Sequence, residues 1–285
     1  MDSSPTADHV TTGPHPVHWS STGEGPALVL LHGLGGDRAF WAAELPQLRD
    51  DFQVITVDLR GSGDTPVTDD GHSMATLADD VCAVLDVAGV ESAHVVGFSM
   101  GGLVAQALAV RHPGRVERLV LASTYAVMNP QARMFLDAVR DVVLAEGSLR
   151  AVFPLVAPWL FSIGFLADPA HAAWFTAPED DPDEIPEPPA GWLAQYQAQR
   201  DFDGRADLAS IRASTLVLSG GQDRLVPADD AAELAAGIAG ATASTYAGSG
   251  HLINVEEPDR FVARVRAFVL GGEDQGRSRK STTRA

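Results

Sequence analysis

The stretch that decides the fold is "AHVVGFSMGGLVAQALAV", residues 93 to 110. Its first six residues are a short apolar run typical of a buried strand, and the residues from Met100 onward have the spacing of a helix. Ser99 stands between the two, with a glycine two residues before it and another two residues after it, which fits G-x-S-x-G. Glycine removes the side chains that would clash where a strand turns sharply into a helix. A serine in this context is typical of a nucleophile, and we predict that role for Ser99.

The same alternation of elements extends along most of the chain. Short apolar runs rich in β-branched residues alternate with longer runs of helical spacing, which predicts a mostly parallel central sheet with helices on both faces. This is an α/β fold. The predicted strands are residues 27–32, 52–58, 93–98, 116–123, 214–220 and 243–247, and the predicted helices begin at Phe40, Met74, Met100, Pro227 and Glu257.

The alternation fails over residues 125–205, a span too long to be a loop within a compact domain. Helical patterns, prolines and more than half of the aromatic residues of the chain lie there. We therefore predict a helical cap, whose aromatic side chains either form a small core of their own or roof a ligand pocket. The predicted organisation is a core domain of residues 1–124 and 206–270, a cap of residues 125–205, and disordered ends at residues 1–16 and 271–285.

The composition excludes several classes of function. The chain has 38 acidic and 20 basic residues and a formal charge of −18, so a nucleic acid would be repelled. Its single cysteine, Cys82, excludes an internal disulfide and a zinc site built from several thiolates. The run "GLGGDR" carries Arg38 where a dinucleotide-binding loop has its third glycine, and neither a Walker loop nor H-E-x-x-H occurs. We expect no cofactor and no metal.

Nothing in the sequence predicts export or a membrane span. The N-terminal residues have neither a basic region nor an apolar region of the kind that forms a signal peptide. The longest apolar stretch, residues 152–167, is interrupted by proline and glycine and is shorter than the roughly 20 residues that a span requires. We expect this stretch to be buried in the protein and the chain to be cytoplasmic, with no membrane partner.

A nucleophilic serine needs a base, and His251 is the histidine best placed to supply one. It lies in "GSGHLINVEEPDRF", after the last predicted strand and before the final helix, so it should reach the same sheet edge as Ser99. His32 closes the first long strand, where we expect it to brace the following loop. Capping or surface roles are sufficient for the remaining histidines.

A carboxylate must orient the base, and two aspartates follow predicted strands. Asp223 lies shortly after residues 214–220 and is favoured. Asp58 is the rival, although its neighbours "RGSG" favour a turn-stabilising network. The glycine-rich loop after the first long strand and the start of the helix after Ser99 should provide the N–H donors of an oxyanion hole, from Leu34 and Met100.

Five segments together resemble the α/β-hydrolase fold superfamily: "HGLGGDRAFW", "DLRGSGDT", "GFSMGGLVAQALAVRHPGRVERLVL", "GGQDRLVP" and "GSGHLINVEEPDRF". The resemblance spans residues 17–270 and is closest to 3-oxoadipate enol-lactonases and cofactor-free haloperoxidase-like esterases. It implies a triad of Ser99, Asp223 and His251, an oxyanion hole from the N–H groups of Leu34 and Met100, and a cap that selects the substrate.

The sequence therefore predicts a serine hydrolase that cleaves a small carboxylic ester or lactone through an acyl-enzyme, without a cofactor. The aromatic cap favours an apolar or aromatic substrate, in catabolism or secondary metabolism. One alternative keeps the site but performs lyase, cyclase or acyltransferase chemistry on a polyketide-like intermediate, and another is a ligand-binding receptor on the same scaffold. Epoxide hydrolase and dehalogenase chemistry is disfavoured because those enzymes of this fold use an aspartate nucleophile where this chain has Ser99.

Overall fold

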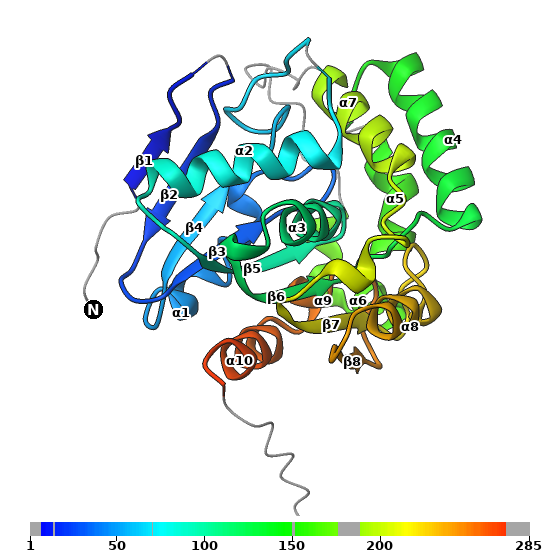
Figure 1. Ribbon diagram of the computed structural model, residues 1–285. Helices are drawn as coiled ribbons and strands as arrows, with labels where there is room; N and C mark the ends of the chain where they lie inside the picture. Colours follow the sequence, from blue (N-terminus) through cyan, green and yellow to red (C-terminus); the bar gives the residue numbers. More distant parts are fainter. Residues whose placement is uncertain (1–6, 14, 70, 150–151, 176–188, 272–285) are drawn as a thin grey trace, which may run out of the picture.

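The computed structural model describes residues 7–13, 15–69, 71–149, 152–175 and 189–271. Within them, eight strands form one twisted sheet in the order β1-β2-β4-β3-β5-β6-β7-β8 (Figure 1). Strand β2 pairs antiparallel with both β1 and β4, and all the other pairs are parallel, which confirms the predicted fold class. The strands are β1 Ala7–Val10, β2 His18–Thr22, β3 Ala27–Leu31, β4 Gln53–Val57, β5 Ala93–Phe98, β6 Val116–Ala122, β7 Ser214–Gly220 and β8 Thr242–Tyr246.

Helices cover both faces of the sheet because both faces of its strands are apolar. Along β3, Val29 and Leu31 join the core on one face, whereas Leu28 and Leu30 join the core on the other, as the two-residue period of a strand requires. One face is covered by α2 Met74–Val87, α3 Met100–Arg111 and α8 Ala228–Gly237, and the opposite face by α1 Leu45–Leu48, α9 Ile253–Glu256 and α10 Pro258–Val269.

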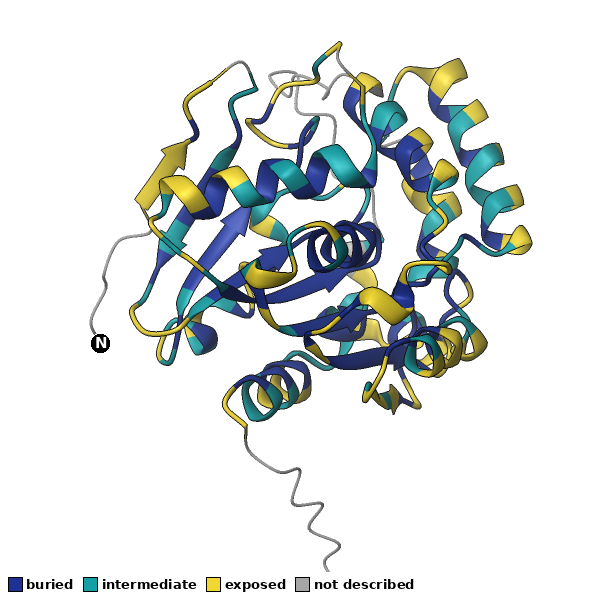
Figure 2. Cartoon of the chain, viewed as in Figure 1, coloured by how far each residue is buried: buried dark blue, intermediate teal, exposed yellow. Residues whose placement is uncertain are grey.

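Helix α3 differs from the other sheet-covering helices in being buried on nearly all sides. Every residue from Met100 to Ala109 is buried, and Figure 2 shows the helix as an almost continuous dark segment beside partly exposed α2. A helix that is apolar all round must lie inside the protein. Because α3 is packed along its whole length, its N-terminus, directly after Ser99, is held in a fixed position.

The segment inserted between β6 and β7 is helical and gathers beyond one end of the sheet (Figure 1). Its first helix has clear sequence signals: the Asn129 side chain accepts a hydrogen bond from the N–H of Ala132, and Gly147 ends the helix in the left-handed conformation. We retain residues 125–205 as the proposed extent of the cap. The inserted helices are α4 Pro130–Glu146, α5 Phe153–Leu160, α6 Ile163–Ala167, the short 3-10 helix η4 Pro169–Trp174, and α7 Pro189–Asp201.

The prediction of a disordered N-terminus over residues 1–16 is wrong for residues 7–10. They form β1, which pairs antiparallel with β2, and the ring of His9 stacks on that of Trp19. All four side chains of β1 are exposed, so no apolar pattern marks this strand in the sequence. Residues 1–6 and 14 lie outside the described residues, as do residues 272–285 of the predicted C-terminal tail.

Two other expectations need correction. The predicted helix from Phe40 is two short pieces, the 3-10 helix η1 Arg38–Trp41 and then α1. The apolar stretch 152–167 is only partly buried, because Leu155 and Ile163 on the outer side of the cap are 50% and 65% exposed. No helix in the described ranges combines the length and the apolar character needed to cross a membrane.

Candidate active site

Ser99 occupies the turn between β5 and α3 in a backbone conformation that few residues adopt. Its φ of 51° is positive, and among the described residues other than glycine only Ser123 shares this feature. Hydrogen bonds hold the turn on both sides: the N–H of Ser99 donates to the carbonyl of Ala122 at 2.9 Å, and the Thr124 hydroxyl donates to the Ser99 carbonyl at 2.7 Å. Hydrogen bonding on both sides thus maintains a backbone conformation that would otherwise be unfavourable, as often occurs at functional positions.

The glycines around Ser99 are required by close backbone contacts, as the sequence predicts. A Cβ at Gly97 would lie 2.7 Å from the Cα of Gly102, and a Cβ at Gly101 would overlap the carbonyls of Leu31 and His32. These neighbours cannot move aside, because the contacts are with the backbone of β3, of the residue that follows it, and of α3. The pattern G-x-S-x-G is therefore the consequence of packing a helix directly against the end of a strand.

The structure brings Ser99, His251 and Asp223 together. The Nε2 of His251 lies 3.0 Å from the Oγ of Ser99, and its Nδ1 lies 2.7 Å from Oδ2 of Asp223. The other oxygen of Asp223, Oδ1, accepts hydrogen bonds from the N–H groups of Leu225 and Val226, both at 2.9 Å. All three side chains are buried, so a proton can pass between serine and imidazole away from bulk water.

The rival carboxylate, Asp58, serves another purpose. Its two oxygens accept hydrogen bonds from the backbone N–H and the guanidinium of Arg38 at 2.7 and 2.6 Å. A third bond comes from the N–H of Asp64 at 3.1 Å. The buried charge of Asp58 is thus neutralised within its own loops, and it makes no hydrogen bond to His251.

The loop that carries Leu34 is braced by His32, in agreement with the sequence. The N–H of Leu59 donates to Nε2 of His32 at 3.1 Å, which places the imidazole proton on Nδ1, 2.8 Å from the carbonyl oxygen of Gly33. Burial lowers the pKa of His32, so the ring stays neutral and can make both bonds.

Both predicted oxyanion donors belong to segments next to Ser99. Leu34 shares a cavity with Ser99 and His251, and the Met100 N–H belongs to the first residue of α3. Neither N–H donates a hydrogen bond to another residue in the described part of the chain. Both donors remain available for an oxygen atom that approaches Ser99.

Three positioning residues were missed by the sequence analysis. The Ser123 hydroxyl donates to the carbonyl of His251 at 2.7 Å, and Thr124 holds Ser99 as described above. Both follow β6, the strand beside β5, so a Ser-Thr pair at that strand end was the available signal. Glu256 accepts the N–H groups of Gly250 and Ser162 at 3.0 and 2.9 Å, joining the histidine loop to the cap, and nothing in the sequence marks this contact.

A cavity of about 430 Å³ opens above Ser99, between the end of the sheet and the cap. Its wall is formed largely by aliphatic and aromatic side chains from α4, α5 and α7. The cap also supports the base directly, because the carbonyl of Leu160 accepts the backbone N–H of His251 at 2.8 Å. The cap therefore both encloses the cavity and fixes one wall of the polar site.

The aromatic residues of the cap take both predicted roles, since some line the cavity and others form a small core of the cap itself. Phe153 and Trp192 line the cavity, as does Phe135, which stacks on Trp159 with ring centroids 4.1 Å apart. Phe161 instead packs with Phe165 and Phe175 in a separate small cluster, and Tyr196 stacks on Trp192 from behind. The side chain of Trp174 lies outside the described part of the cap.

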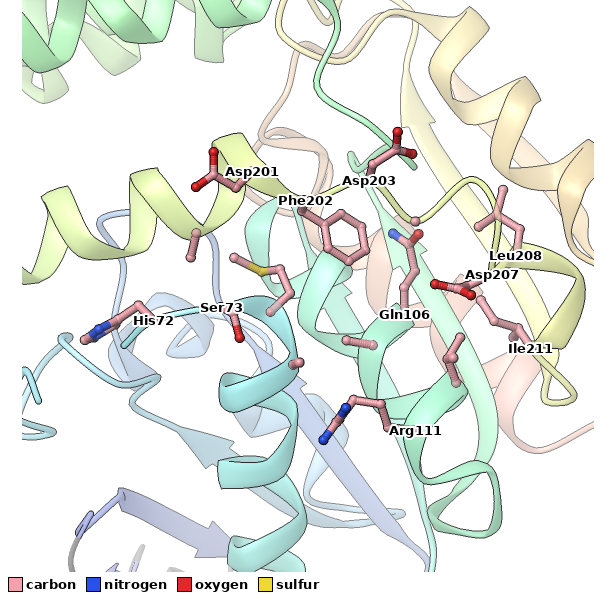
Figure 3. Close-up of a pocket in the computed structure, with 16 residues that line it drawn as sticks. His72, Ser73, Gln106, Arg111, Asp201, Phe202, Asp203, Asp207, Leu208 and Ile211 are labelled. Atoms are coloured by element: carbon pink, nitrogen blue, oxygen red, sulfur yellow. The ribbon is translucent and has the colours of Figure 1, made fainter. Parts of the chain in front are cut away.

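A second cavity, of about 480 Å³, lies where the start of α2, the middle of α3 and the end of α7 meet (Figure 3). Asp201, Asp203, Asp207 and Gln106 are among the residues that line it. It contains none of the residues around Ser99, so the smaller cavity is the candidate active site.

Comparison with known proteins identifies the family. The family model described as "alpha/beta hydrolase fold" matches residues 26–258. A protein of Caulobacter sp. (strain K31) named "Putative carbamate hydrolase RutD" is 32% identical over 259 residues, which cover 90% of this chain and 95% of that protein.

Two solved structures are similar over nearly the whole chain. A hydrolase from Pseudomonas aeruginosa PA01 is 31% identical with a TM-score of 0.78, covering 95% of this chain and 100% of that one. The enol-lactonase from Burkholderia xenovorans LB400 is 27% identical with a TM-score of 0.79, covering 93% and 100%. The chain therefore belongs to the alpha/beta hydrolase fold family and is a hydrolase.

Proposed function

We propose that this hydrolase cleaves carboxylic esters or lactones with an apolar acyl or alcohol part, through an acyl-enzyme on Ser99. The observation that carries the proposal is the contact of Ser99 Oγ with His251 Nε2 at the floor of a cavity with an apolar wall. Such a relay turns an unreactive hydroxyl into a nucleophile.

In the first half of the reaction, Oγ of Ser99 attacks the carbonyl carbon while Nε2 of His251 takes its proton. The resulting imidazolium is stabilised by the carboxylate of Asp223, which accepts the Nδ1 proton in a hydrogen bond. The carbonyl oxygen becomes negatively charged as the bond to Ser99 forms. The N–H groups of Leu34 and Met100 are the donors we propose for this oxyanion, each contributing about 3 kcal/mol in known cases.

The first half ends when the bond between the carbonyl carbon and the alcohol oxygen breaks and the protonated His251 gives its proton to that oxygen, which leaves the acyl group on Ser99. In the second half, the neutral His251 acts as a base again. A water molecule loses a proton to Nε2 and attacks the acyl carbon, the bond to Ser99 Oγ breaks, and His251 returns the proton to Oγ. For a lactone, the alcohol and acid produced are parts of one molecule.

The cavity favours an apolar substrate over a small polar one. Its wall presents Val139, Leu136 and Phe135 from α4 and Val156 from α5, so an alkyl or aryl group would be transferred from water to a well-packed apolar surface. The similarity to the Burkholderia enol-lactonase supports a cyclic ester among the substrates.

The relative named as a carbamate hydrolase raises a carbamate as the second candidate. A carbamate has the same acyl carbon for Ser99 to attack, but a small one would leave most of the apolar wall without contact. The ratio of kcat/KM for a p-nitrophenyl ester and a p-nitrophenyl carbamate of matched size decides between them, and we expect the ester to be preferred.

The decisive experiment replaces Ser99 by Ala and measures hydrolysis of p-nitrophenyl hexanoate. We expect kcat/KM to fall about 10⁴-fold or more, since triad serines contribute at least this much. A fluorophosphonate should label the wild-type protein once and leave Ser99→Ala unlabelled, as measured by mass spectrometry. Unchanged hydrolysis in Ser99→Ala would overturn the proposal, and a product without added water would favour lyase, cyclase or acyltransferase chemistry.

A further inference from the structure

One polar pair interrupts the apolar wall of the cavity above Ser99. Tyr125, which follows β6, and Gln199, on α7, both line this cavity and are only 2% and 3% exposed. The side-chain amide N–H of Gln199 donates to the phenolic oxygen of Tyr125 at 2.7 Å. No step of the proposed reaction uses either residue.

The hydrogen-bonding capacity of this pair is not filled by the protein. Oε1 of Gln199 is buried and accepts no hydrogen bond from a described residue. The phenol of Tyr125 accepts from Gln199, and none of the hydrogen bonds in the described ranges has its O–H as the donor. Buried polar groups in folded proteins are nearly always paired, so one unmet acceptor beside one unmet donor calls for an explanation.

A ligand hydroxyl would complete both bonds at once. Its oxygen can accept from the phenol of Tyr125, and its proton can be donated to Oε1 of Gln199. Burial raises the pKa of Tyr125 far above its ordinary value, so the phenol keeps its proton and remains a donor. A carboxylate would satisfy the phenol alone, and the chain, with its formal charge of −18, would repel it.

We propose that Tyr125 and Gln199 form a recognition site for one neutral hydroxyl on the otherwise apolar part of the substrate. The inference rests on the proposed ester or lactone hydrolysis and narrows its substrate class to hydroxylated esters or lactones. A site built to bind a substrate hydroxyl strongly discriminates against the analogue that lacks it, because its own polar groups are then left unpaired.

The test compares p-nitrophenyl hexanoate with a series of hexanoate esters, each of which carries one hydroxyl at a different carbon. Esters that cyclise spontaneously are left out of the series. For wild-type protein we expect kcat/KM of the best hydroxylated ester to exceed that of the plain ester about tenfold or more. In Tyr125→Phe and in Gln199→Leu this advantage, taken as the ratio of the two kcat/KM values measured on the same variant, should fall to about twofold or less.

Two matched control variants change residues of α7, the helix that carries Gln199. Tyr196→Phe removes a phenol that donates to Asp137 and does not line the cavity, and Gln197→Leu changes an exposed glutamine. Both should keep the wild-type advantage. If Gln199→Leu does not fold, Tyr125→Phe alone decides, since it keeps the ring.

The outcomes separate this inference from the proposed function. Absence of any hydroxyl advantage in wild-type protein, or its persistence in either Tyr125→Phe or Gln199→Leu, overturns the recognition site while Ser99-dependent hydrolysis of the plain ester stands. Hydrolysis of the plain ester that does not depend on Ser99 overturns the proposed function instead.

Discussion

The sheet edge and the cap build the same cavity by different means. At the sheet edge, the positions of Ser99, His251 and Asp223 are set by backbone: a strained turn, two N–H groups on one carboxylate oxygen, and a carbonyl of the histidine held by Ser123. In the cap, the wall is set by side chains that contact one another, such as the stacked rings of Phe135 and Trp159.

This difference predicts that the sheet edge sets the reaction rate and that the cap sets the substrate preference. Polar atoms fixed by the backbone can be placed closely enough for proton transfer. A small displacement of these atoms lowers the reaction rate for every substrate. Apolar side chains that interlock can be exchanged with a smaller loss, so changes in the cap should alter which substrate is preferred. The two regions meet at Leu160 and Glu256, where the histidine loop touches the cap.

The largest effect should come from Asp223→Asn at the sheet edge. Loss of the negative charge removes the stabilisation of the imidazolium and disturbs the tautomer of His251, so kcat should fall about 10⁴-fold for every ester while KM changes little. Steady-state kinetics with short and long p-nitrophenyl esters measure it. Asp229→Asn, at an exposed position on α8, is the matched control and should be active. A loss confined to one ester would contradict a purely catalytic role for this edge.

The second effect concerns the backbone contact that makes the edge rigid. Gly101→Ala places a methyl group against the carbonyls of Leu31 and His32, and we expect a loss of about 3 kcal/mol in the free energy of unfolding. Urea denaturation followed by circular dichroism measures this loss. The matched control is Gly114→Ala, where nothing lies within 4 Å of the added methyl, and its change should stay within about 0.5 kcal/mol. Equal stability of the two variants would show that the edge adapts like the cap.

A smaller effect, and a selective one, is expected in the cap. Phe135→Ala removes a ring from the cavity wall, so the ratio of kcat/KM for p-nitrophenyl decanoate over acetate should rise about tenfold. Leu144→Ala, on the outer side of the same helix, should leave the ratio unchanged because that side chain is exposed. An equal fall with both esters would mean that the cap sets the rate and not the preference.

The smallest effect is the pH dependence of stability from His32. Burial lowers its pKa in the folded protein, whereas the unfolded chain takes up the proton near pH 6.5. The stability that the neutral ring contributes is therefore present above pH 6.5 and is lost as the pH falls towards the lowered value, with a slope of at most ~1.4 kcal/mol per pH unit. Urea denaturation of His32→Gln between pH 7 and pH 5 should show a shallower loss than wild type.

Glu44 provides a comparison in which the free energy of unfolding changes with pH in the opposite direction. Burial raises the pKa of its carboxyl, so the stability that the protonated form contributes is lost as the pH rises above the ordinary value of 4.5. Glu44→Gln should therefore gain stability over wild type towards neutral pH and lose this advantage in acid. If both variants respond to pH in the same direction, burial is not the cause of either effect.

Local sequence was sufficient for most of the sheet and for the polar site. The alternation of strands and helices places the ends of β5, β7 and β8 at one edge, so Ser99, Asp223 and His251 could be selected by their positions after those strands. The pattern could not reveal β1, whose four exposed side chains carry no apolar signal and whose pairing depends on the open edge of β2.

What the sequence determined by itself was the class of fold and which polar residues lie at the sheet edge, because both follow from short-range patterns that fix the direction of the backbone. Only the tertiary structure decided which cap residues reach the cavity, that Asp58 belongs to Arg38 and not to His251, and that Tyr125 meets Gln199. Those contacts join residues far apart in the chain, and side-chain packing between separate elements leaves no periodic signal in the order of amino acids.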